Sequence, residues 1–213
     1  MKVGNPPPPP RRMVVHALAH APRTVLVDAS AMVASTGQRT VWQIDPKHTA
    51  VEFAVSYLTF TTVKGRFEGV SGTIRGDAAD PARASVEVEI DAASLETHEA
   101  RRDTHLRSAD FLDVERYPTI TFTSTAVEPL DERRLRVRGE LTIRGKTRPV
   151  VLDAELKGRG RNPDGLEVVG ISARAEINRR DFGLTWNQTL ETGGVLVGDA
   201  VAIAVELQAI RQD

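Results

Sequence analysis

The run Val86-Glu87-Val88-Glu89-Ile90-Asp91 alternates strictly between apolar and acidic side chains. Successive side chains of a β-strand point to opposite faces, so this run predicts a strand with one dry face and one wet face. The same alternation recurs along the chain, in residues 51–57, 136–144, 171–178 and 201–207. Alternation in several separate segments indicates an antiparallel sheet that buries one face.

Glycine, proline and aspartate separate these runs, as in Asn162-Pro163-Asp164-Gly165. Several runs are longer than the about five or six residues that strands most often hold. Long alternating strands joined by short turns fit either a sandwich or a closed barrel. Because few helices are available to cover the dry face, we expect an all-β fold, an elongated eight-stranded antiparallel barrel of the lipocalin type.

One link between strands breaks the alternation, Arg101-Arg102-Asp103-Thr104-His105-Leu106-Arg107-Ser108-Ala109-Asp110-Phe111-Leu112-Asp113. Thr97 can cap a helix here, and Glu99 suits a first helical turn, where the helix dipole favours a negative charge. Nothing in residues 100–106 breaks a helix. We therefore expect one short helix in this link.

The length of 213 residues fits one large β domain. We expect residues 1–40, with the proline run at 6–10, to form a disordered or weakly ordered arm, and residues 41–213 to form the barrel. The net charge of −1 argues against a dedicated nucleic-acid binder. The chain has no cysteine, which excludes disulfides and thiolate chemistry.

The N-terminal region carries no convincing export or membrane sequence. No run approaches the roughly 20 apolar residues of a membrane-spanning helix. Residues 13–34 lean apolar after two arginines, but Pro22, Arg23 and Asp28 interrupt them, unlike the apolar core of a signal peptide. We expect a cytoplasmic protein.

The predicted inward residues mix aromatic with small side chains. The aromatic residues include Phe53, Tyr57, Phe67 and Phe122, and the small ones include Gly139, Ala154, Ala173 and Ala175. Small residues leave space, which favours an apolar cavity suited to a long hydrocarbon. The alternative is a filled core in which the small residues serve tight barrel corners.

Six short motifs, in order, resemble the YceI-like family. They are Trp42-Gln43-Ile44-Asp45-Pro46-Lys47-His48-Thr49, Val63-Lys64-Gly65-Arg66-Phe67, Arg102-Asp103-Thr104-His105-Leu106 with Asp110-Phe111 and Tyr117-Pro118, Gly139-Glu140-Leu141-Thr142-Ile143-Arg144-Gly145, Arg180-Asp181-Phe182-Gly183-Leu184 and Val197-Gly198-Asp199. The resemblance implies a lipocalin-like barrel that binds polyisoprenoids or related long amphiphiles. Where many members have histidine in the first long strand, this chain has Tyr57.

The candidate ligand-binding residues are apolar side chains with a few polar groups for a head group: Phe53, Val55, Tyr57, Phe67, Phe111, Phe122, Trp186, His48 and His105. Two of them have structural alternatives. His48 could instead close the Asp45-Pro46 turn, and His105 could join Asp103 and Arg102 in a charged cluster that fixes the helix across the barrel end. Trp186 could line the pocket or plug the barrel.

No metal site, catalytic residue or cofactor is expected, apart from a bound isoprenoid-type lipid as ligand. His98 and His105 lie seven residues apart, whereas helical zinc motifs place two histidines at i and i+4. No serine lies in a nucleophile-elbow setting.

The leading hypothesis is non-enzymatic binding, storage or transport of a long-chain isoprenoid lipid, such as a quinone or its precursor. One alternative is an enzyme that acts on a barrel-bound lipid, with His48, Tyr57 or His105 in acid–base roles. Another is a protein-docking module that uses the charged helix. The expected partner is a long-chain amphiphilic lipid, with no nucleic acid and no membrane span, and a homodimer is one assembly that the outer faces of such barrels allow.

Overall fold

The structure is a computed structural model, and it describes residues 39–58, 60–77, 80–189 and 195–212. The predicted arm lies outside the described residues, apart from Arg39 and Thr40. The elements are β1 (Thr40–Ile44), η2 (Pro46–His48), β2 (Ala50–Tyr57), β3 (Thr61–Phe67), β4 (Val70–Asp77), β5 (Asp80–Asp91), η3 (Ala92–Ser94), β6 (Leu95–Glu96), α1 (Ala100–Arg107), β7 (Thr119–Pro129), β8 (Arg134–Ile143), β9 (Lys146–Arg161), β10 (Glu167–Asn178), η4 (Arg179–Phe182) and β11 (Val197–Gln212).

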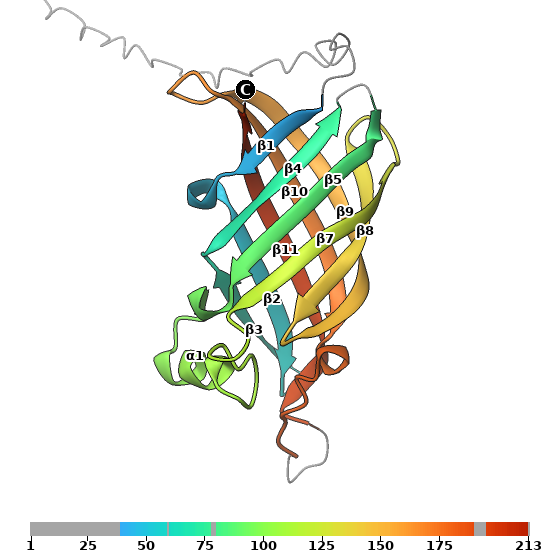
Figure 1. Cartoon of the computed structure of the whole chain (residues 1–213). Helices are drawn as coiled ribbons and strands as arrows, with labels where there is room; N and C mark the ends of the chain where they lie inside the picture. Colours follow the sequence, from blue (N-terminus) through green and yellow to red (C-terminus); the bar gives the residue numbers. More distant parts are fainter. Residues whose placement is uncertain (1–38, 59, 78–79, 190–194, 213) are drawn as a thin grey trace, which may run out of the picture.

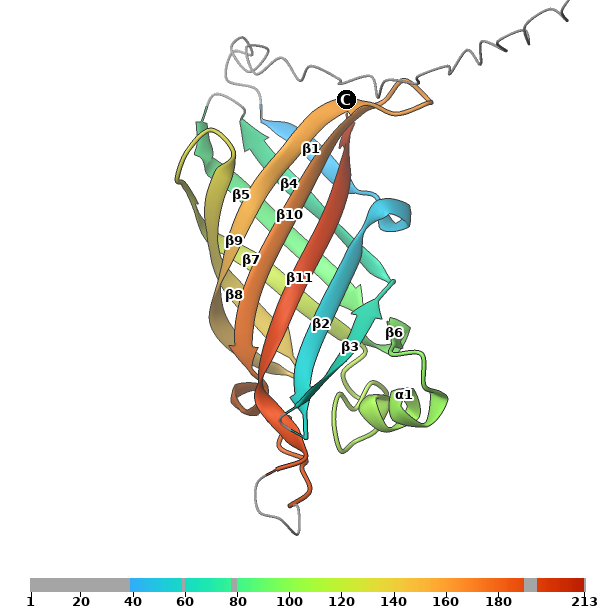
Figure 2. The ribbon, with the colours of Figure 1, turned by 180° about the vertical axis from the view of Figure 1, so that it is seen from behind.

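The predicted eight-stranded antiparallel barrel is confirmed. The strands β4, β5, β7, β8, β9, β10 and β11 follow one another in the sheet, and β1 pairs with both β4 and β11, which closes a ring of eight. Every predicted alternating run lies in one of these strands or in β2, except that Arg144 follows the end of β8. The ribbon is elongated along the barrel axis (Figure 1 and Figure 2).

Short interruptions divide three of the long strands into pieces. The Asp45-Pro46 turn separates β1 from β2, and both pieces pair with β11. In the same way, β3 and β4 are two consecutive pieces of one long strand. Piece β3 pairs with β2, and piece β4 pairs with β1. After η3, the short strand β6 pairs with β3 instead of β7. The chain therefore leaves the sheet between β6 and β7, where α1 lies.

The two ends of the barrel differ. We call the end that carries α1, the β8–β9 turn and η4 the helix end, and the end that carries Thr40 and Gln212 the terminus end (Figure 1). At the terminus end, Trp42, Val169 and Ala209 pack together, and Ala209 is fully buried. At the helix end, Phe182 is the largest fully buried side chain.

The predicted helix is present as α1, but its cap is not the predicted residue. Glu99 is the N-cap, and its carboxylate accepts hydrogen bonds from the backbone N–H groups of Arg101 and Arg102. Thr97 is buried and lies too far before the helix to cap it. Its backbone N–H and its hydroxyl donate to the buried carboxylate of Asp103. Thr97 therefore anchors the helix from the side.

Candidate functional site

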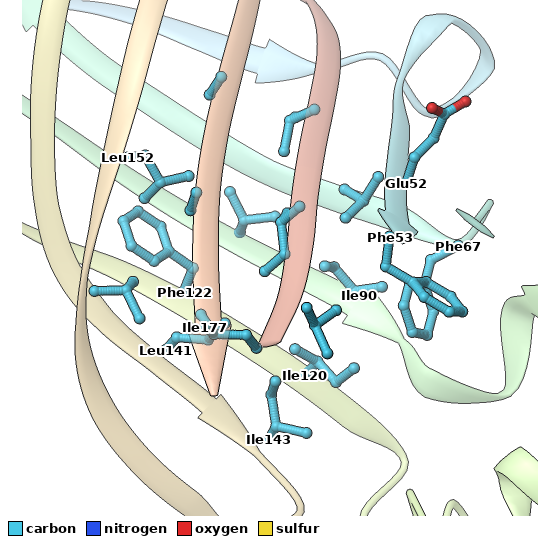
Figure 3. Close-up of a pocket in the computed structure, with 18 of the residues that line it drawn as sticks. Glu52, Phe53, Phe67, Ile90, Ile120, Phe122, Leu141, Ile143, Leu152 and Ile177 are labelled. Atoms are coloured by element: carbon cyan, nitrogen blue, oxygen red, sulfur yellow. The ribbon is translucent and has the colours of Figure 1, made fainter. Parts of the chain in front are cut away.

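The barrel encloses an apolar cavity of about 310 Å³. This volume lies within the range of about 300 to 1,000 Å³ that ligand pockets in proteins show. Inward-facing residues of nearly every strand form its wall, and Leu106, Phe111 and Leu112 close it from the helix segment. Figure 3 shows how the aliphatic and phenyl side chains converge from the surrounding strands.

Among the described residues that line the cavity, Glu52 and Arg179 alone have ionisable side chains. Glu52 is exposed, and it faces Arg66 and Ala204 on the neighbouring strands, on the outward row of the sheet. Arg179 is buried, and all three nitrogens of its guanidinium donate to backbone carbonyls. The interior therefore offers a ligand dispersion and hydrophobic contacts, without a free charge in the wall.

Five of the nine candidate residues lie in this wall: Phe53, Val55, Phe67, Phe111 and Phe122. The rings of Phe53 and Phe67 lie beside each other, with their centroids 5.8 Å apart (Figure 3). The four others, Tyr57, His48, His105 and Trp186, lie outside the cavity wall.

Glycines face two of the wall phenylalanines. A Cβ on Gly65 would lie 2.4 Å from the ring of Phe53, and a Cβ on Gly139 would lie 2.4 Å from the ring of Phe122. As a small inward residue, Gly139 is predicted to leave space. The ring of Phe122 occupies that space, so Gly139 lets an aromatic side chain lie flat against the wall.

His48 takes the turn-closing position. Its Nδ1 lies 2.6 Å from a carboxylate oxygen of Asp45, and its side chain is 63% exposed. The hydrogen bond from His48 lowers the pKa of Asp45 from its ordinary value, and the backbone N–H of Lys47 lowers it further. Tyr57 lies at the end of β2, opposite Val197 and Thr61.

His105 and Trp186 form an aromatic cluster with Phe111 at the helix end. The imidazole of His105 stands edge-on to both other rings, with centroid distances of 4.7 Å to Trp186 and 5.0 Å to Phe111. Its Nε2 lies 2.9 Å from Asp110. The predicted cluster of His105 with Asp103 and Arg102 does not form, because those two residues bind Thr97 instead.

Arg179, which no sequence pattern singled out, organises the same end. Its guanidinium donates to the backbone carbonyls of Leu184, Trp186, Val197 and Gly198. The pKa of Arg179 is lowered from its ordinary value. Burial causes this shift, and the nearby carboxylate of Asp199 opposes it. One buried cation thus ties the segment after η4 to the start of β11.

Within the described part of the chain, no three histidine, aspartate or glutamate side chains gather as ligands for a metal ion. No helix among these residues is both long and apolar enough to cross a bilayer.

Comparison with known proteins gives consistent matches. The family model described as the YceI-like domain matches residues 42–209. A UPF0312 protein of Vibrio cholerae is 40% identical over 143 residues, which cover 66% of this chain and 76% of the relative. A UPF0312 protein of Pseudomonas syringae pv. syringae is 40% identical over 138 residues, covering 65% and 72%.

Solved structures share the fold. BcnA of Burkholderia cenocepacia superposes with a TM-score of 0.68 at 24% identity and covers 78% of this chain and 98% of its own. The YCEI protein of Campylobacter jejuni gives a TM-score of 0.63 at 32% identity, covering 74% and 90%. A polyisoprenoid binding domain from Saccharophagus degradans gives 0.57 at 17% identity, covering 80% and 98%.

Proposed function

This chain belongs to the YceI-like family, and from that premise we propose that it binds a long-chain isoprenoid lipid inside the barrel, without chemical turnover. A quinone or a quinone precursor is the ligand class that we propose, held for storage or transport. The observation that carries the proposal is the closed barrel around an apolar cavity. The polyisoprenoid binding domain among its structural neighbours supports an isoprenoid ligand.

The energetics favour a hydrocarbon chain. Each methylene that moves from water into an apolar interior contributes about 0.8 kcal/mol. The wall supplies aliphatic and phenyl contacts over several strands, so affinity accumulates along the chain of the ligand and depends little on its end group. Such a site holds long apolar molecules and discriminates weakly among short polar ones.

The placement of the polar candidates supports binding over catalysis. His48, Tyr57 and His105 were the residues with acid–base potential, and all three lie outside the cavity wall. A general base has to come within hydrogen-bond reach of the proton that it removes.

A cytoplasmic location and a homodimer stay predictions of the sequence.

Native mass spectrometry of the full chain, purified without detergent, tests the proposal. We expect an added mass of a few hundred daltons that organic solvent releases and that fragments as a prenyl lipid. A bare polypeptide mass, together with no uptake of an added polyprenol, would refute the proposal.

A matched pair of variants locates the lipid. Ala175 lies in the cavity wall on β10, whereas Ala202 on the adjacent strand β11 is exposed. Ala175→Leu adds three carbon atoms to the cavity and displaces about as many methylenes of the ligand. We expect a loss of about 2 kcal/mol, or roughly thirty-fold in affinity. Ala202→Leu should leave the affinity unchanged.

A further inference from the structure

Two segments that lie far apart in the sequence meet at the helix end. The β2–β3 turn and the start of β11 are joined by the ladder pair of Tyr57 with Val197 and by a hydrogen bond of 2.9 Å from the backbone N–H of Leu58 to the carbonyl of Leu196. The loop between η4 and β11 joins them, because the backbone N–H of Leu196 donates to the carbonyl of Gln188. Both views show these segments projecting beyond the sheet along the barrel axis (Figure 1 and Figure 2). We call them the tip, which consists of residues 56–58, 60–62, 184–189 and 195–198.

The tip presents apolar side chains to solvent. Phe60 is 79% exposed, the highest fraction among the large apolar side chains of the described residues. Val195, on the segment that joins the β2–β3 turn, is 41% exposed. Single exposed apolar residues are common, but exposed apolar residues on adjoining loops indicate an interaction surface.

The described residues of the tip contain no charged side chain, although charged residues make up 27% of the chain. Glu191, in the same loop, lies outside the described residues. The exposed apolar side chains of the terminus end have charged neighbours instead, since Leu130 precedes Asp131 and Leu166 precedes Glu167. The tip therefore suits a partner surface that requires no ion pairs.

Aromatic side chains suit the tip to the surface of a bilayer in particular. Tyr57 and Trp186 accompany Phe60 there, and both are partly buried. Tyrosine and tryptophan are the residues that gather at membrane–water interfaces, where the ring lies among the acyl chains and the polar atom meets water. An apolar surface that lies at the level of the headgroups binds in proportion to the apolar area that it buries.

The tip adjoins the cavity. Val197 belongs to the tip and lines the cavity, and Leu184 does so as well. The ring of Trp186 lies 5.3 Å from the ring of Phe111, measured between their centroids, and Phe111 closes the cavity from the helix segment. A surface that contacts the tip therefore lies against the end of the barrel that contains these closing residues.

We propose that the tip docks on a phospholipid bilayer, so that the helix end of the barrel meets the membrane when the lipid is loaded or released. This inference rests on the proposed function, because a long isoprenoid chain is held in bilayers and is costly to pass through water. The attraction is hydrophobic, with Phe60 as its main contact. Docking is therefore reversible and insensitive to salt, unlike the binding of a basic surface to anionic lipids.

Flotation of the full chain with phosphatidylcholine vesicles tests the docking. We expect wild-type protein to float with the vesicles to the same extent at 0.1 M and at about 1 M salt. Phe60→Ser should lower the partition coefficient by about ten-fold, the effect of partly burying one phenyl ring. Leu166→Ser is the matched control, because Leu166 is 47% exposed in the β9–β10 turn at the opposite end, and it should bind like wild type.

The two tryptophans of the chain report which end meets the bilayer. Trp186 belongs to the tip, whereas Trp42 is buried at the terminus end. Vesicles of brominated phosphatidylcholine quench a tryptophan that they contact. We expect quenching in wild-type protein and its loss in Trp186→Phe, which keeps Trp42 as the reporter. Quenching that persists in Trp186→Phe would place the contact at the terminus end and overturn the proposal.

The possible results separate docking from lipid binding. Absence of flotation, or equal losses in Phe60→Ser and Leu166→Ser, overturns docking by the tip and leaves the proposed function intact if native mass spectrometry still finds a bound isoprenoid. A wild-type dimer that Phe60→Ser dissociates, without vesicle binding, would make the tip an interface between two copies and also overturn the proposal. Flotation without any isoprenoid bound overturns the proposed function instead. Unchanged unfolding midpoints in urea would show that the variants are folded.

Discussion

The contact between Gly139 and Phe122 allows a quantitative test of how the cavity wall is built. A Cβ on residue 139 would lie 2.4 Å from two carbons of the Phe122 ring and 2.6 Å from the backbone oxygen of Thr123. Ordinary van der Waals contact begins near 3.4 Å. In Gly139→Ala the ring therefore has to move by about 1 Å, into the cavity, where it loses part of its packing.

The free-energy change follows from the geometry. Overpacking of this kind costs about 1 to 3 kcal/mol, and the backbone contact with Thr123 places Gly139→Ala near about 3 kcal/mol. Phe122→Leu alone removes ring contacts and should cost about 1 kcal/mol. In the double variant the smaller side chain leaves room for the new methyl group, so we expect a total cost of about 2 kcal/mol. The two changes are then coupled by about 2 kcal/mol.

Urea unfolding of the lipid-free full chain measures the four corners of this cycle. Bound lipid has to be removed first, because a ligand of the native state adds to its stability. Gly160→Ala is the control, since a Cβ there would meet nothing within 4 Å, and it should change stability by less than about 0.5 kcal/mol. Additive costs for Gly139→Ala and Phe122→Leu would refute the argument that the ring occupies the space of the missing side chain.

Three further predictions concern Asp131 in the β7–β8 turn and two residues of the helix end. The backbone N–H groups of Arg133 and Arg134 hold the pKa of Asp131 at about 2, below its ordinary value of 3.8. The Asp131 carboxylate therefore stabilises the fold above pH 3.8. This contribution disappears as the pH falls through about 2. Asp131→Asn should therefore lower the urea midpoint at pH 6 and match wild type near pH 2; an equal difference at both values would contradict this. Arg179→Met leaves several carbonyls without donors and should cost about 3 to 5 kcal/mol in thermal unfolding, so a cost below about 1 kcal/mol would show that the network is dispensable. Asp103→Ala leaves the buried backbone N–H and hydroxyl of Thr97 without an acceptor, which should lower the free energy of unfolding by about 2 kcal/mol. Amide exchange in α1 should accelerate, and unchanged exchange would contradict the anchoring role.

The fold could be predicted from the sequence because the alternation of apolar and polar side chains along each strand is a local pattern. Alternation in residues 86–91 or 171–178 reports directly which face of a strand is dry, and the small number of helices available to cover that face favours a sheet closed on itself. The same rule predicts the inward rows that contain Phe53, Phe67 and Phe122. The sequence does not reveal how far a ring reaches across the sheet, so it does not show that the ring of Phe122 occupies the space beside Gly139.

The ends of the barrel could not be predicted in the same way. Thr97 has the side chain of a helix cap, but Glu99 takes that position, while Thr97 binds Asp103 six residues away. Arg179 follows an alternating strand and resembles an exposed cation of the next turn. Its burial depends on carbonyls brought together by the return of β11, a long-range arrangement that no local pattern encodes.

The two ends are closed by different interactions, and this difference bears on how a ligand exchanges. At the terminus end, β1 hydrogen-bonds to both neighbours and Trp42 packs among buried residues. At the helix end, guanidinium groups of Arg107, Arg144 and Arg179 hold loop carbonyls in place of a continuous ladder. A protein opens locally where its contacts are fewest and least cooperative. A few side-chain hydrogen bonds can break while the barrel stays intact, whereas opening the terminus end disrupts the sheet itself, so the helix end is the physically cheaper path for a lipid that enters chain first.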